Sequence, residues 1–214
     1  MIGSVMENKE TFQARIQPFF SPSEQLDIKL AYTLAKFGHR AQLRKELIDG
    51  KQIRYFEHVR RVALILMDDM KIMDRDMIIA ALLHDSLEDT EDLTAELLEH
   101  SFGSNVATMV TILSKIPKEG YHQRLHNCQN WKVLALKMCD RLDNLRSLMV
   151  AGVSLEFQKR QIQETKEHYF SLFDRLIQMC PANYRATLIS VRDEVRDIVT
   201  KCSTIIELRE GQTA

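Results

Sequence analysis

Three observations predict that this chain has an all-α fold. Its 214 residues include only 7 glycines and 4 prolines, whereas residues that favour helices, such as leucine, alanine, glutamate and lysine, are abundant. Apolar residues recur with a period near 3.6 along almost the whole chain, and no segment alternates convincingly between apolar and polar residues. Because hydrophobic residues make up 45% of this length, we expect one compact domain with a real core.

The first two helices are predicted before residue 40. Residues 7–20 are expected to form a short amphipathic helix. The second helix begins at Ser21, with Pro22 at its first position and Glu24 completing a capping box, and it runs towards His39. Its apolar residues at near-helical spacing are Leu26, Leu30, Leu34 and Phe37.

The middle of the chain is predicted to contain two helices that follow a loop. Residues 44–54 are polar, contain Gly50 and are expected to form the loop. A helix is predicted over residues 55–70, with Val59, Val62, Leu66 and Met70 along one stripe. Another is predicted to start near Asp74 and to include residues 77–89.

The remaining elements are also predicted to be helical. A helix that follows Asp92 or Thr94 should end at Phe102-Gly103, because glycine commonly terminates helices. Residues 106–116 form a further segment, and residues 117–130 a polar connection. Three more helices are predicted after this connection. The first begins at Trp131, and the other two span residues 154–179 and 182–207. The two C-terminal helices either only cover the core or form the face of a homodimer, and the sequence leaves both alternatives open.

Composition excludes several classes of function. The formal net charge is −1, so no overall field attracts the chain to nucleic acid or to an anionic membrane. No apolar run approaches the roughly 20 residues needed to cross a bilayer, and residues 1–20 do not resemble a secretory signal. The four cysteines show no paired spacing and are expected to be reduced. We therefore expect a soluble cytoplasmic protein.

The most informative residues are His84 and Asp85, which directly follow a strongly apolar run and should therefore lie near the core. On a continuous helix, Glu88 and Asp89 would lie one turn further along the same side. Three carboxylates at one edge of a buried helix repel each other and are costly to desolvate. A divalent cation between them would remove both costs, which is a physical reason to expect a metal site.

Residues on two other predicted helices extend this set. His58 lies at the start of an apolar stripe, and Asp140 shares a helix face with Asn144 and Ser147. Two imidazoles and two carboxylates suit Mn²⁺, Fe²⁺ or Zn²⁺ and leave coordination positions for water and substrate. Magnesium ranks lower, because it prefers oxygen ligands.

The order of these residues resembles the HD superfamily of metal-dependent phosphohydrolases. Glu88-Asp89-Thr90 after His84-Asp85 gives the HDxxEDT form that is typical of the Rel/Spo alarmone enzymes and of the small alarmone hydrolases. Residues 39–45, 102–106, 140–148 and 164–169 are similar to that family's HxxQxRK, FGxxV, DRLxNxRTL and ETxxxY motifs. The resemblance covers about residues 26–176.

The resemblance implies a function for each matched residue. His58, His84, Asp85 and Asp140 would hold one Mn²⁺, with Fe²⁺ or Zn²⁺ as less favoured ions. Glu88 and Asp89 would orient or activate the attacking water. The residues expected to contact the nucleotide are Arg44, Lys45, Asn144, Ser147, Arg141 and His39, although His39 can equally be a structural residue at the end of its helix. The implied reaction is removal of pyrophosphate from the 3′ position of ppGpp or pppGpp, leaving GDP or GTP.

The same resemblance suggests a division of the chain. Residues 1–22 would be an N-terminal extension, residues 23–180 the hydrolase core, and residues 181–214 a C-terminal helix packed on that core. The expected partner is a small nucleotide, with neither nucleic acid nor membrane.

Two other functions remain open, and departures from the family pattern keep the first of them open. The segment between Arg44 and His58 is several residues longer than in the family, and Asp143 stands where the family often has histidine or tyrosine, which would add negative charge beside the phosphate site. One alternative is an HD phosphohydrolase that acts on another nucleotide or phosphoester. The other is a catalytically inactive regulator that binds the alarmone.

Overall fold

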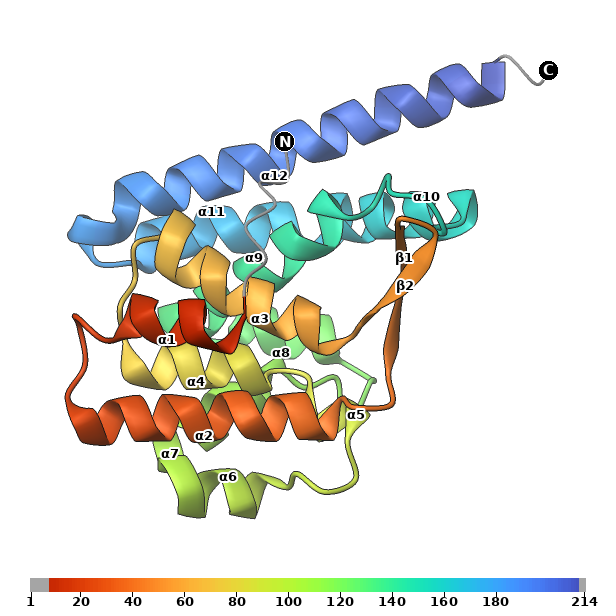
Figure 1. Ribbon diagram of the computed structural model, residues 1–214. Helices are drawn as coiled ribbons and strands as arrows, with labels where there is room; N and C mark the ends of the chain where they lie inside the picture. The colour runs from red at the N-terminus through yellow and green to blue at the C-terminus, as the bar shows by residue number, and fades with distance from the viewer. Residues whose placement is uncertain (1–7, 212–214) are drawn as a thin grey trace.

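The structure is a computed structural model that describes residues 8–211, and it confirms the predicted all-α fold. Figure 1 shows the helices packed into one bundle, with a short β-hairpin as the only sheet among the described residues. The elements are α1 (Lys9–Ile16), α2 (Pro22–Gly38), β1 (Leu43–Ile48), β2 (Lys51–Arg54), α3 (Phe56–Leu64), the π-helical turn η1 (Ile65–Asp69), α4 (Arg75–Leu83), α5 (Ser86–Asp89), α6 (Ala95–Phe102), α7 (Ser104–Leu113), α8 (Tyr121–Asn127), α9 (Trp131–Arg146), α10 (Leu155–Glu164), the π-helical turn η2 (Thr165–Tyr169), α11 (Phe170–Met179) and α12 (Ala182–Gly211).

Helix α4 lies at the centre of the bundle. Every residue from Met77 to Leu83 is fully buried, and α4 packs against α2, α3, α7 and α9. The apolar run therefore requires neighbours on all sides, as expected of a helix that is hydrophobic all round. Helix α9 packs against α3, α7, α11 and α12. Together α3, α4 and α9 form the scaffold that carries the residues singled out in the sequence.

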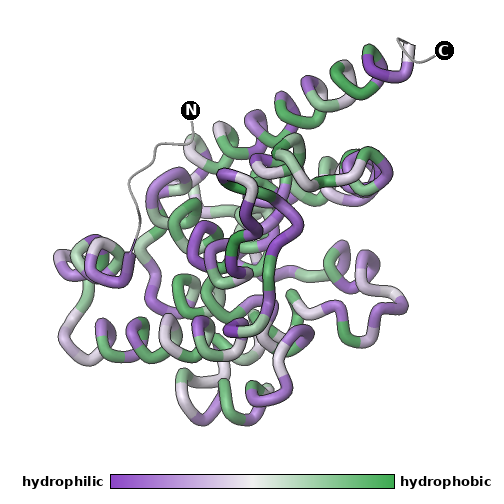
Figure 2. The backbone as a smooth tube through the Cα atoms, turned by 45° about the vertical axis from the view of Figure 1, so that its right-hand side comes forward, coloured by the Kyte–Doolittle hydropathy of each residue, from purple (hydrophilic) through white to green (hydrophobic). Residues whose placement is uncertain are grey.

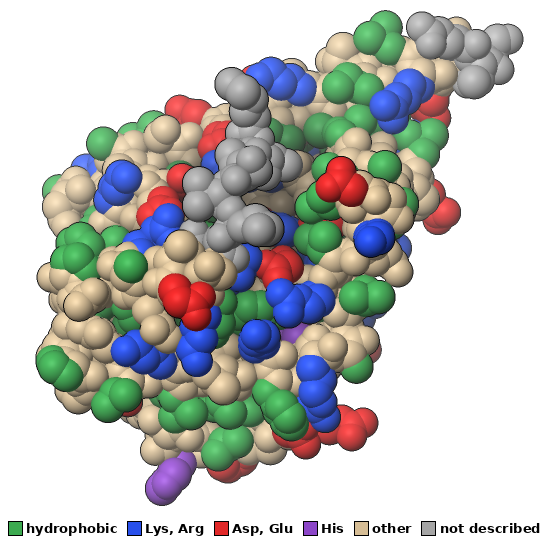
Figure 3. Space-filling view, in the orientation of Figure 1, with side chains coloured by type: hydrophobic (Ala, Val, Ile, Leu, Met, Phe, Trp, Pro, Cys, Tyr) green, Lys and Arg blue, Asp and Glu red, His purple; other side chains and the backbone are tan. Residues whose placement is uncertain are grey.

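Both N-terminal helices begin at a capping residue, which for α2 is the predicted one. Asn8 caps α1, and the part of the predicted 7–20 helix that precedes Asn8 lies outside the described residues. Ser21 and Glu24 form the predicted capping box at the start of α2. The buried face of α2 consists of Ile28, Ala31, Tyr32 and Ala35. By contrast, three of the four residues that marked its apolar spacing are exposed, namely Leu26, Leu30 and Phe37. Figure 3 shows hydrophobic side chains on the surface of the molecule in the region where Figure 1 places α2.

The prediction of a loop over residues 44–54 is wrong, because these residues belong to the antiparallel hairpin β1–β2. The strands pair Leu47 with Gln52 and Ile48 with Lys51. Asp49 and Gly50 both have positive φ, at 51° and 74°, which is the backbone that a tight two-residue hairpin turn requires. The alternation of apolar and polar residues here is too weak to identify strands, but the Asp-Gly pair was a hairpin signal.

Two further stretches differ from, or refine, the sequence prediction. The connection over residues 117–130 contains the helix α8, which buries Tyr121 and Leu125 against the core. The predicted helix over residues 154–179 is present as the continuous run of α10, η2 and α11, and α12 extends to Gly211. The C-terminal end of α12 reaches beyond the rest of the bundle in Figures 1 and 2. Among residues 8–211, no helix combines the length and apolar character needed to cross a membrane.

The hairpin is fastened to the bundle at Gly152. The Leu47 amide donates a hydrogen bond of 2.8 Å to the carbonyl oxygen of Ala151. Gly152 has φ of +89°, and a Cβ atom at this position would lie 2.5 Å from the carbonyl oxygen of Lys45. Only glycine therefore allows the hairpin to approach this closely.

A substitution at Gly152 should destabilise the protein more than one at Gly50. Gly50→Ala should cost about 1–2 kcal/mol, since its positive φ disfavours a side chain and no atom lies within 4 Å. Gly152→Ala should cost roughly 1–3 kcal/mol more, because its Cβ also meets the hairpin backbone. Urea denaturation of both variants measures the difference, and equal losses would show that the contact with the hairpin is unimportant.

Candidate metal centre and substrate pocket

Four side chains from three helical segments meet at one buried point. His58 comes from α3, His84 and Asp85 from the end of α4, and Asp140 from α9. His58 Nε2 lies 3.3 Å from Asp140 Oδ1 and 3.5 Å from Asp85 Oδ2. His84 Nε2 lies 3.1 Å from Asp85 Oδ2 and 3.8 Å from Asp140 Oδ1. Ligand atoms of His58, His84 and Asp140 all lie within 4.8 Å of one another, which is suitable for a shared metal ion.

The neighbours His84 and Asp85 lie at the junction between α4 and α5 and face the same point. On an uninterrupted helix, adjacent side chains diverge by about 100°. Here α4 ends at Leu83, and α5 starts anew at Ser86, whose hydroxyl donates a hydrogen bond of 2.6 Å to the Leu83 carbonyl oxygen. The expected continuous helix through Asp89 is thus wrong in detail, although His84 and Asp85 both keep right-handed helical backbone angles.

Each imidazole uses Nδ1 within the protein and presents Nε2 to the centre. His84 Nδ1 donates to the carbonyl oxygen of Ala81 at 2.9 Å, and His58 Nδ1 donates to Asp143 Oδ2 at 2.7 Å. His84 Nε2 is buried and makes no hydrogen bond to any described residue. A metal-binding histidine commonly has this arrangement, with one nitrogen held by an acceptor and the other free for the ion. The four residues therefore fit a divalent cation.

The carboxylates of this cluster are ionised at neutral pH. Burial would raise the pKa of Asp85, but the His84 and His58 imidazoles outweigh it and hold that pKa well below the usual value. Burial likewise acts against Asp140, yet Lys137 and the two imidazoles hold its pKa well below the usual value. Burial acts to lower the pKa of His58, but hydrogen bonds with Asp140, Asp143 and Asp85 raise it to about 9. Asp85 and Asp140 are thus available as anionic ligands.

Glu88 and Asp89 lie on the short helix α5, next to the centre. Burial raises the pKa of each carboxyl, and the nearby charge of Asp85 adds to the increase. Glu88 is held in place because its Oε1 accepts a hydrogen bond of 2.8 Å from the Lys115 backbone amide. Two carboxyls with raised pKa values beside a candidate metal centre are suited to taking up and releasing protons.

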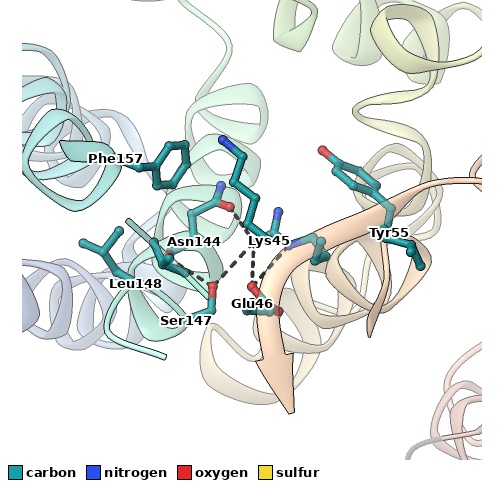
Figure 4. A pocket seen from close by; sticks show the side chains of 10 residues that line it. Lys45, Glu46, Tyr55, Asn144, Ser147, Leu148 and Phe157 are labelled. Carbon is teal, nitrogen blue, oxygen red and sulfur yellow. Dashed lines mark hydrogen bonds and ion pairs between the residues drawn. The ribbon is translucent and has the colours of Figure 1, made fainter. Parts of the chain in front are cut away.

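A pocket of about 230 Å³ opens next to Tyr55 and Asn144, which are hydrogen-bonded to Asp85 and Asp140. Figure 4 shows the side chains that line it. Its lining residues are Leu43, Arg44, Lys45, Glu46, Tyr55, Asn144, Ser147, Leu148, Val153 and Phe157. Arg44 Nη2 donates to Asn144 Oδ1 at 2.9 Å, and Asn144 Nδ2 donates to Asp140 Oδ1 at 2.6 Å. Lys45 Nζ lies 4.0 Å from the centre of the Phe157 ring. The pocket therefore combines cations, an amide and an apolar wall, and it is linked directly to the metal centre.

Four of the six residues expected to contact substrate line this pocket, namely Arg44, Lys45, Asn144 and Ser147. His39 does not. It is fully buried, and its ring stacks on the Tyr55 ring at 4.9 Å. Arg141 also lies elsewhere, because its guanidinium is buried against Tyr169 and forms an ion pair of 3.1 Å with Glu164.

Several residues of the site were missed or misinterpreted in the sequence. The Tyr55 hydroxyl donates to Asp85 Oδ2 at 2.7 Å, and buried Lys137 donates to Asp140 Oδ2 at 2.6 Å. Asp143 does not add negative charge beside the phosphate site as expected, since it is buried between His58 and Arg61. Its spacing of three residues from Asp140 was the available signal, because such residues share a helix face.

Comparison with known families and long relatives supports the sequence resemblance. The sequence model of the family described as HD domain matches residues 31–177, a range that includes His58, His84, Asp85 and Asp140. A guanosine-3′,5′-bis(diphosphate) 3′-pyrophosphohydrolase of Aquifex aeolicus is 38% identical over 164 residues, which are 72% of this chain and 22% of that protein. The bifunctional (p)ppGpp synthase/hydrolase SpoT of Escherichia coli is 30% identical over 179 residues, 78% of this chain and 24% of that protein. The chain thus spans about a quarter of the length of these relatives.

Two other matches extend over most of both proteins. A guanosine-3′,5′-bis(diphosphate) 3′-pyrophosphohydrolase of Drosophila melanogaster is 35% identical over 135 residues, which are 60% of this chain and 73% of that protein. A solved structure of a metazoan ortholog of SpoT that hydrolyses ppGpp superimposes with a TM-score of 0.62 at 27% identity. That match covers 81% of this chain and 95% of the other.

Proposed function

This chain belongs to the HD-domain family, and on that premise we propose that it is a metal-dependent hydrolase of guanosine tetra- and pentaphosphate. It would remove the 3′-diphosphate group and release pyrophosphate together with GDP or GTP. The observation that carries the proposal is the convergence of His58, His84, Asp85 and Asp140 beside a pocket that contains Arg44 and Lys45. Relatives named as hydrolases of this nucleotide support the choice of substrate.

The four converging residues are the proposed ligands of the metal, and Mn²⁺ is the proposed ion. Two imidazole nitrogens and two carboxylates form a mixed set of donors that suits manganese, and no thiolate contributes. When bound there, a divalent cation supplies Lewis-acid activation of water and of a phosphoryl oxygen.

The residues around the centre have distinct proposed functions in the reaction. Water adds to the phosphorus atom next to the ribose 3′-oxygen, the bond between these two atoms breaks, and the 3′-oxygen takes up a proton as pyrophosphate leaves. Glu88 and Asp89 are the proposed carboxylates that orient the water and accept its proton, because their raised pKa values suit proton transfer. Arg44 and Lys45 face the negative charges of the substrate.

Incubation of the purified chain with ppGpp and Mn²⁺ tests this function. Chromatography should resolve GDP and pyrophosphate as the products, and a His84→Ala variant treated in the same way serves as the blank. Release of orthophosphate would contradict the proposal and favour a phosphatase that acts on another phosphoester. Tight binding of ppGpp without turnover would favour the inactive regulator.

Arg44→Ala should weaken substrate binding. Its guanidinium donates to Asn144 inside the pocket, and the loss of a charged hydrogen bond of about 1.5–3 kcal/mol corresponds to a rise of roughly 10–100-fold in KM. Steady-state kinetics with ppGpp measures the change. Arg40→Ala is the matched control, because Arg40 lies four residues earlier with a side chain that is 55% exposed. An equal effect of both substitutions would remove Arg44 from the substrate site.

A further inference from the structure

A network of hydrogen bonds leaves the metal centre at one residue and returns to it at another. The network starts at His58, whose Nδ1 donates to Asp143 Oδ2 at 2.7 Å. Arg61 holds the same carboxylate with two donors, since its Nε lies 2.6 Å from Asp143 Oδ1 and its Nη2 lies 3.0 Å from Asp143 Oδ2. Asp143 therefore holds the His58 imidazole on the side opposite Nε2, and Arg61 holds Asp143 in turn.

The network continues into the substrate pocket. Arg61 Nη2 also donates to Glu46 Oε1 at 2.8 Å, and the other oxygen of Glu46 lies 3.3 Å from Arg44. Arg44 then donates to Asn144, which donates to Asp140. Figure 4 shows Glu46, Asn144 and Ser147 converging on the polar side of the pocket. A single closed network thus connects a candidate metal ligand from α3, the hairpin, and a second candidate ligand from α9.

Besides Asp140, the network contains two carboxylates that are costly to bury. Asp143 is 2% exposed and Glu46 is 4% exposed. Burial of a carboxylate is unfavourable unless charged partners compensate for the lost water. His58 and Arg61 supply these partners for Asp143, because each donates a hydrogen bond to its carboxylate. Buried ion pairs of this kind add little net stability to a fold. The orientation that they impose on neighbouring side chains is therefore the property that we interpret.

We propose that Asp143 and Arg61 are positioning residues for the metal ligand His58. Asp143 fixes the imidazole with Nε2 directed at the centre, and Arg61 fixes Asp143. Glu46 connects Arg61 to Arg44 in the pocket. Arg61 thereby orders both the metal centre and the substrate site. The inference rests on the proposed metal-dependent function.

The two-pronged shape of Arg61 is essential to this assignment. Its Nε and Nη2 atoms reach both oxygens of Asp143, and Nη2 also reaches Glu46. A lysine at this position would keep the positive charge, but its single ammonium group cannot span the same acceptors. If Arg61 acts by orientation, lysine will not replace it.

Titration of the metal-free, 214-residue chain with Mn²⁺ in a calorimeter tests the proposal. Asp143→Asn and Arg61→Met should each weaken Mn²⁺ binding by roughly 10–100-fold, as expected when the partner of a metal-binding histidine is lost. The Arg61→Lys variant should bind Mn²⁺ nearly as weakly as the Arg61→Met variant. The matched control is Arg60→Met, because Arg60 is the adjacent arginine on α3 and pairs with Glu57 instead.

A second measurement separates positioning from a general loss of structure. With Co²⁺ in place of Mn²⁺, the visible absorption bands report the geometry of the ligands, and they should shift in Asp143→Asn and remain unchanged in Arg60→Met. Asp143→Asn and Arg61→Met variants with wild-type affinity and wild-type Co²⁺ bands would overturn the positioning function while the metal centre stands. Full recovery of affinity in Arg61→Lys would also overturn it. A wild-type chain that binds no ion would overturn the metal centre and this inference together.

Discussion

Replacement of His84 by alanine is expected to abolish metal binding and turnover together. His84 Nε2 is buried and directed at Asp85 and Asp140, with no hydrogen bond to any of residues 8–211. Removal of this nitrogen takes away one of four proposed ligands and leaves two carboxylates facing each other with less compensation. Asp85→Ala should have the same consequence, because it removes the carboxylate that lies closest to His84 Nε2.

Metal content and rate must be measured on the same preparations. Inductively coupled plasma analysis gives the ratio of metal to protein, and release of pyrophosphate from ppGpp gives the rate. His100→Ala is the control, since His100 is an exposed histidine at the end of α6. Asp85→Asn, which keeps the shape of the side chain, guards against misfolding as the cause. A His84→Ala protein that retains the wild-type metal ratio would show that His84 is not a ligand.

Glu88→Gln should leave the metal bound and reduce the rate by about 10²–10⁴-fold, which is the usual contribution of a general base. Glutamine keeps the oxygen that accepts the hydrogen bond from the Lys115 amide, so the position of α5 should be preserved. What it lacks is the ability to take a proton. Glu91→Gln is the control, because Glu91 is an exposed glutamate three residues later. An unchanged rate in Glu88→Gln would assign proton transfer to Asp89, which Asp89→Asn then tests.

The same substitution has a predictable effect on stability. Burial raises the pKa of Glu88 in the folded protein, so ionisation of this carboxyl opposes folding once the pH exceeds its unfolded-state value. Glu88→Gln should therefore be at least as stable as the wild type at pH 7. The difference should disappear in acid, where the carboxyl is protonated in both states. Urea denaturation at the two pH values measures this. A glutamine variant that is less stable at pH 7 would indicate that the ionised carboxylate is stabilising.

The sequence predicted which four side chains lie together better than it predicted the backbone that carries them. The apolar run before His84 correctly indicated burial, and the types and order of His58, Asp85 and Asp140 indicated a shared cation. The break after Leu83 could not be predicted, because nothing in the run 80–89 resembles a helix stop. It depends on packing around α4 and on the hydrogen bond of the Ser86 hydroxyl.

Contacts between distant residues account for most of the remaining differences. Asp143 and Arg61 are 82 positions apart, so only the packing of α3 on α9 reveals that the two side chains bind each other. The hairpin is stabilised by Ala151 and Gly152 rather than by a strong alternating pattern. On α2, leucines at helical spacing indicated a helix but not which face is buried, because the smaller residues Ala31 and Ala35 allow the closest packing.

The break between α4 and α5 also determines how the site could be re-engineered. Two of the four proposed ligands are consecutive residues at one helix end, so the peptide bond fixes the separation of their Cα atoms. The other two come from separate helices, α3 and α9, whose spacing depends on the apolar side chains between them. Selection for an ion of different radius should therefore alter the packing between α3 and α9 and leave the His84-Asp85 pair intact.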